Sequence, residues 1–148
     1  MPGIHPEDVL DQFEEIVPSA AANGDQYLRA IVQGVRFQQL PVAADMRLEP
    51  LIGGFRASKT DCLILTPTDS RLQRFEMLHY AVPVGQSLRI GWYLLGGVKA
   101  KGLGGWAILG GSTQMDMDNL QGLVQLVMEC AVVPAVQDIA DDAGLVSG

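Results

Sequence analysis

Apolar residues follow a helical spacing at both ends of the chain and a different pattern between them. Within residues 6–17 they recur at the i, i+3, i+4, i+7 spacing of an amphipathic helix, which Pro18 ends. A second helical stripe covers residues 25–39 and stops before Pro41. Two short neighbouring helices predict a helical hairpin over residues 6–40.

The middle of the chain has short apolar runs bounded by glycine, proline and polar residues, a pattern typical of strands. The connections between the runs are short, which favours antiparallel pairing. We therefore expect a mainly antiparallel sheet of about five strands within residues 46–111. The expected strands lie near residues 46–55, 61–66, 74–82, 87–95 and 105–109.

One stretch of this region contains a short internal repeat. GWYLLGG is followed by GWAILGG, and the two tryptophans of the chain, Trp92 and Trp106, take matching places. Each half is an apolar run bounded by glycines, as in a strand buried on both faces. We expect residues 91–95 and 105–109 to pair as an antiparallel hairpin in the middle of the sheet.

A long helix is expected over residues 116–140, because apolar residues again follow a helical stripe. Its segment from 130 to 136 is apolar on every side, which indicates burial, and Pro134 is expected to kink or restart it. The element order predicts one α+β domain, residues 1–148, in which this helix packs on the sheet. The stripe consists of Leu120, Leu123, Val124, Val127 and Ala131.

Charge and hydropathy narrow the classes of partner. Hydrophobic residues make up 48% of the chain and the formal net charge is −7. An acidic chain is a poor ligand for nucleic acid or an anionic membrane surface, so neither is expected as a partner. No segment has the features of a signal peptide or a membrane span, which predicts a cytoplasmic protein.

Few residues have a pattern that suggests chemistry. The two histidines, His5 and His79, have no second histidine or cysteine at metal-ligand spacing, and Cys62 and Cys130 have no adjacent base. No nucleophile motif, metal site or cofactor fingerprint is present. We therefore expect no catalytic residue, metal or cofactor, and favour a protein that is not an enzyme.

The glycine-rich loop between the two copies of this repeat has two interpretations. Lys99 and Lys101, together with the free amides of the loop, could hold a phosphate or a carboxylate. The simpler interpretation is a hairpin turn whose lysines keep an apolar strand pair soluble.

Two functional hypotheses remain. The first is a non-enzymatic interaction domain of adaptor, chaperone-like or toxin-neutralising type. It acts as a homodimer, with Val132, Val133 and Val136 of the apolar helix segment at an interface. The alternative is a small-molecule-binding protein or enzyme with an apolar cavity between the sheet and the last helix. The expected lining residues are Trp92, Tyr93, Trp106, Phe75, Met77 and His79.

Overall fold

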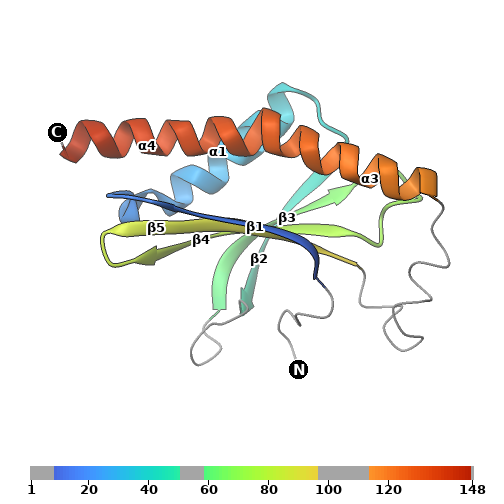
Figure 1. Cartoon of the computed structure of the whole chain (residues 1–148), viewed down its shortest axis with the longest axis horizontal. Coiled ribbons are helices and arrows are strands. Elements are labelled where there is room, and N and C mark those ends of the chain that lie inside the picture. The colour runs from blue at the N-terminus through green and yellow to red at the C-terminus, as the bar shows by residue number, and fades with distance from the viewer. Residues whose placement is uncertain (1–8, 51–58, 97–113, 148) are drawn as a thin grey trace.

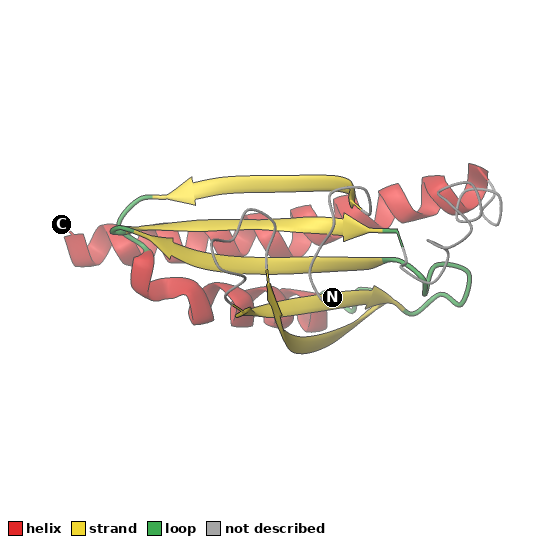
Figure 2. Ribbon diagram, turned by 90° about the horizontal axis from the view of Figure 1, so that it is seen from below, coloured by secondary structure: helices red, strands yellow, loops and turns green. Residues whose placement is uncertain are grey.

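The computed structural model describes residues 9–50, 59–96 and 114–147 and has two layers, with the helices on one face of a sheet (Figures 1 and 2). The five described strands follow the order β1-β5-β4-β3-β2, and every neighbouring pair is antiparallel. The predicted antiparallel α+β sheet with a long C-terminal helix is therefore confirmed. The elements are β1 (Val9–Val17), a 3-10 turn (Ala21–Asn23), α1 (Gly24–Phe37), β2 (Val42–Pro50), β3 (Lys59–Pro67), β4 (Glu76–Val84), β5 (Ser87–Leu95), α3 (Gln114–Val127), a π-helical turn (Met128–Val132) and α4 (Val133–Ser147).

The start of the chain differs from the sequence-based expectation. Val9–Val17 is a strand that pairs with β5, so the predicted helical hairpin over residues 6–40 is wrong, and α1 is the one α-helix among the described residues before the sheet's second strand. A helix here would bury its apolar stripe, yet Leu10 and Ile16 are 42% and 49% exposed. Phe13 instead packs against the core cluster beneath the helices. The open edge of β5 outweighs the local helical spacing, because tertiary pairing overrides weak propensity.

The predicted hairpin of residues 91–95 with 105–109 is also wrong. Both edges of the 91–95 segment are taken, since Trp92 pairs with Phe13 of β1 on one side and with His79 of β4 on the other. Residues 105–109 themselves lie outside the described part of the chain. The segment is nevertheless central in the sheet, as its apolar composition predicts.

The two helical segments of the upper layer lie antiparallel to each other. Asn23 and Gln26 at the start of α1 donate to Asp142 and Asp138 of α4, each at 3.0 Å. Farther along, Gly34 allows close contact, because a Cβ there would lie 2.9 Å from the Cys130 carbonyl oxygen. The two helices together cover the large core cluster on this face of the sheet.

The C-terminal helix is continuous, and it passes Pro134 through the π-helical turn. The Val133 amide donates to the Met128 carbonyl, five residues back, which widens the helix just before the proline. A proline ring clashes with the carbonyl four residues earlier in an α-helix, and this wider turn accommodates it. In place of the expected kink the helix has a local widening, and Figure 1 shows α3 and α4 as one long helix.

Gln114–Gly144 is also long and apolar enough to cross a membrane by length and composition alone. Its apolar stripe packs on the sheet, and Leu120 and Val127 are 1% and 0% exposed. Core helices share these features, so the helix gives weak evidence for a membrane span.

Candidate functional site

The residues predicted to line a cavity lie on both faces of the sheet. Phe75, Met77 and Trp92 belong to the core cluster beneath the helices, and His79 pairs with Trp92 across β4 and β5, which places it on the same face. Tyr93 faces the opposite side, where its ring stacks on Tyr80 at 5.3 Å between centroids. Trp106, Lys99 and Lys101 lie outside the described residues.

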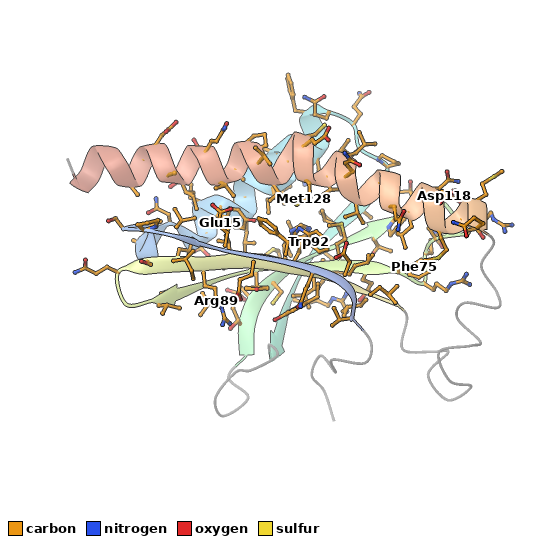
Figure 3. All side chains as sticks on the ribbon, viewed as in Figure 1. Glu15, Phe75, Arg89, Trp92, Asp118 and Met128 are labelled. Carbon is orange, nitrogen blue, oxygen red and sulfur yellow. The ribbon has the colours of Figure 1, made fainter. Side chains whose placement is uncertain are left out.

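Side chains fill most of the space beneath the helices. Trp92 donates its indole N–H to the Met128 sulfur at 2.9 Å and stacks on Phe13 (Figure 3). The enclosed cavity lined by Phe75 and Met77, under α3, holds about 10 Å³. That is room for one water at most. A second, open groove of about 410 Å³ lies between β1, β5 and α3, and Trp92, Leu94, Val124 and Met128 are in its lining. Of the predicted cavity residues, Trp92 lies at this groove, and Phe75 and Met77 line the small cavity.

His79 lies fully buried in the centre of the sheet. Within the described part of the chain neither ring nitrogen has a hydrogen-bond partner, and burial lowers the pKa of His79 to about 3. The ring is therefore neutral at physiological pH. A general base needs a proton acceptor that a substrate can reach, and His79, at 0% exposure, offers none.

A polar cluster on the opposite face joins β1, β4 and β5. Tyr80 donates its hydroxyl to Glu14 at 3.0 Å, and the Arg89 Nε lies 3.4 Å from the same carboxylate oxygen. Burial is the largest of the causes that raise the pKa of Tyr80. A raised pKa keeps the phenol protonated at neutral pH, so Tyr80 stays a hydrogen-bond donor to Glu14 and the cluster ties the three strands together.

Metal ligands and cysteines were the other groups considered for chemistry. Among the described residues, no three His, Cys, Asp or Glu side chains are grouped so that they could hold a metal ion. Neither Cys62 nor Cys130 is part of a disulfide, and Cys62 donates to the Thr60 carbonyl at 3.2 Å.

The apolar helix segment exposes little surface. Val132 is 0% exposed and belongs to the core, and Val136 packs against the core as a partly buried residue. Only Val133 of the predicted interface trio is exposed, at 43%. The valines therefore do not form a continuous contact surface.

β2 forms one edge of the described sheet. This strand is last in the strand order, and among the described strands only β3 pairs with it. Its central residue, Met46, faces the helix layer and is 51% exposed, with Asp45 and Arg47 on either side. Arg47 donates to Glu76 of β4 at 2.8 Å on the other face.

The phase of the β2–β3 ladder shows which β2 residues turn their backbone groups outward. The Thr68 amide donates to the Pro41 carbonyl at 3.0 Å, just before the Val42–Pro67 pair. Val42 is therefore in a non-hydrogen-bonded pair, and in an antiparallel ladder the two kinds of pair alternate. Every second residue from Val42, including Met46, directs its N–H and C=O away from β3.

A groove runs between this strand and α1. It encloses about 380 Å³. Leu28, Val32 and Met46 form its apolar surface, and Arg29 and Arg36 provide its positive charge. Neither arginine forms an ion pair with any residue that the structure describes. Asp25 and Gln33 complete the lining.

The sequence alone did not indicate this site. Arg29 and Arg36 lie on the polar side of a correctly predicted helix, where solvent exposure alone explains them. The available signal was the order Asp45-Met46-Arg47, in which opposite charges flank an apolar residue. This pattern indicates a pairing site only when β2 is an edge strand, and the sequence does not give the strand order.

Comparison with known proteins adds no family to this description. No protein family, curated protein or solved structure matches the chain. The function is therefore inferred from the chemistry of the described surface.

Proposed function

We propose that the chain is a non-enzymatic protein-interaction domain that acts as a homodimer, with two copies paired antiparallel along their β2 edges. The observation that supports this proposal is the self-complementary order of charge and backbone phase around Met46. An unprotected strand edge is a template for pairing with a further strand. A second copy of the same strand satisfies both the hydrogen bonds and the charges.

The proposed register places a two-fold axis at Met46. Met46 turns its N–H and C=O outward, so it forms a hydrogen-bonded pair with the partner's Met46. Asp45 then lies opposite the partner's Arg47 and Arg47 opposite the partner's Asp45, in non-hydrogen-bonded pairs whose side chains are close. Arg47 already contacts Glu76 and Asp45 of its own chain, at 2.8 and 3.8 Å, and in the proposed dimer the partner's Asp45 joins this cluster.

Neighbouring registers are disfavoured by charge. Only registers in which the outward-facing residues of the two strands lie opposite each other preserve the hydrogen bonds. The next such register in one direction centres the axis on Asp45 and places two carboxylates opposite each other. The next register in the other direction centres it on Arg47 and places two guanidinium groups opposite each other. Like charges directly opposite destabilise a strand pair. The register at Met46 is therefore favoured over both.

The other edge of the described sheet lacks this complementarity. β1 has three acidic side chains, Asp11, Glu14 and Glu15, and no basic one. Antiparallel pairing of β1 with its own copy would bring carboxylates together, and charge on an edge strand is a common protection against such pairing. The same kind of charge change should therefore weaken dimerisation when it is made on β2 and leave dimerisation unchanged when it is made on β1.

Sedimentation velocity tests the proposal. We expect the wild-type protein to sediment as a dimer, and Asp45→Arg to weaken dimerisation about 30-fold, since two favourable cross-strand pairs become repulsive at roughly 1 kcal/mol each. Asp11→Arg makes the same charge change on β1 and is the matched control, which we expect to remain dimeric. A monomeric wild type, or an Asp11→Arg protein that dissociates while Asp45→Arg does not, would contradict the proposal.

A further inference from the structure

We propose that the two α1–β2 grooves of this dimer join across the two-fold axis into one cleft that binds an acidic amphipathic helix of a partner protein. The inference rests on the proposed function. Met46 links the two, because it lies at the proposed axis and also lines the groove. The grooves of both copies would then share a floor made by the two Met46 side chains.

The width of the joined cleft suits one helix. α1 begins above β4, where a Cβ on Gly24 would lie 3.6 Å from the Ala81 Cβ. β4 is two strands from β2, and strands are spaced by about 4.8 Å, so the first turn of α1 lies about 12 Å from the axis and about 24 Å from its copy. Packed helix axes are about 8–10 Å apart, so one further helix fits between the first turns of the two α1 helices.

The backbone chemistry favours a helical occupant. In the dimer, the outward N–H and C=O groups of β2 are already paired with the second copy, so an incoming strand finds no edge to join. A segment that enters the cleft has to satisfy its own backbone groups, and a helix does so internally. Recognition of a helix by an apolar groove is an established mode of binding.

The side chains of the cleft favour acidic and apolar groups on that helix. Leu28, Val32 and Met46 form an apolar floor, and methionine adapts to varied apolar surfaces. Arg29 and Arg36 of each copy bring four guanidinium groups to the walls. The net charge of −7 per chain opposes an acidic ligand at long range, but salt screens it beyond about 8 Å. The arginines therefore act at contact distance, where carboxylates bind guanidinium well.

Fluorescence anisotropy with two designed peptides tests the inference. The probe is a fluorescein-labelled, end-capped helix of 18 residues built from leucine, alanine and glutamate, and its companion has lysine at every glutamate position. We expect the wild-type dimer to bind one glutamate helix per dimer and to bind the lysine helix at least about tenfold more weakly. Raising the salt concentration should weaken binding of the glutamate helix.

Paired variants locate the binding site. Arg29→Gln with Arg36→Gln lowers the charge of each chain by two, and Gln121→Glu with Gln137→Glu does the same at exposed positions away from the groove. We expect the Arg29→Gln, Arg36→Gln protein to remain dimeric and to lose affinity for the glutamate helix about tenfold. The Gln121→Glu, Gln137→Glu protein should bind that helix as the wild type does.

The possible failures are distinguishable. A dimer that ignores the glutamate helix, binds both peptides equally, binds two helices, or is unaffected by the arginine changes would overturn the joined cleft and leave the dimer standing. Tighter binding of a labelled 18-nucleotide oligothymidine than of the glutamate helix would also overturn it. A wild-type monomer in sedimentation would remove the dimer, and the joined cleft with it.

Discussion

Gly91→Ala is expected to lower the free energy of unfolding by about 3 kcal/mol, the upper part of the usual range for overpacking. A Cβ at this position would contact the Phe13 carbonyl oxygen of β1 and lie 2.5 Å from the Tyr80 hydroxyl oxygen. The first contact is with backbone, so β1 itself has to move. Alanine is favoured over glycine in a strand by only about 0.5–1 kcal/mol, and the clash therefore dominates.

Gly122→Ala is the matched control for this variant. Gly122 lies in α3, and a Cβ there would meet nothing within 4 Å. Alanine in an exposed helix interior is favoured over glycine by about 1 kcal/mol, so this variant should be more stable than the wild type. Urea unfolding of both proteins measures the difference. Equal effects of the two substitutions would contradict the close contact of β1 with Gly91.

His79 is expected to make the protein less stable in mild acid. Its folded pKa of about 3 lies below the ordinary value of 6.5, because burial disfavours the charged ring. The unfolded chain therefore binds the proton more readily. The stability from neutral His79 is present above pH 6.5 and is lost as the pH falls toward 3. From pH 7 to pH 5 the loss amounts to about 2 kcal/mol.

His79→Leu should remove this part of the pH dependence. Leucine cannot take up a proton, so the change in unfolding free energy between pH 7 and pH 5 should be about 2 kcal/mol smaller than in the wild type. At pH 7 the variant should be no less stable, because neither ring nitrogen of His79 has a described partner to lose. His5→Gln serves as the reference for the other histidine. An unchanged pH dependence in His79→Leu would contradict the burial of a neutral ring.

Several elements could be predicted from the sequence because a single local signal determined them. The stripe over residues 25–39 became α1, and the runs near 61–66, 74–82 and 87–95 became β3, β4 and β5. Their apolar spacing and their proline or glycine boundaries agree with the tertiary structure. The C-terminal helix was predicted for the same reason.

Other elements depended on contacts far apart in the sequence. β1 has a helical spacing but forms a strand, because β5 supplies an edge some seventy or more residues later in the chain. β2 was expected near residues 46–55 but runs over Val42–Pro50, because its pairing with β3 begins at the Val42–Pro67 pair. The candidate site depends on strand order in the same way, because Asp45 and Arg47 matter only at a sheet edge.

Native mass spectrometry of an equimolar mixture of Asp45→Arg and Arg47→Asp tests the proposed β2 pairing most directly. Alone, each variant places like charges opposite each other, and we expect each to be mainly monomeric at 15.9 kDa. Mixed, one chain has arginine at both positions and the other has aspartate at both, so every cross-strand pair is again opposite in charge. The account predicts a heterodimer that forms only on mixing. Folded variants that stay monomeric in the mixture, or that dimerise equally well alone, would contradict it.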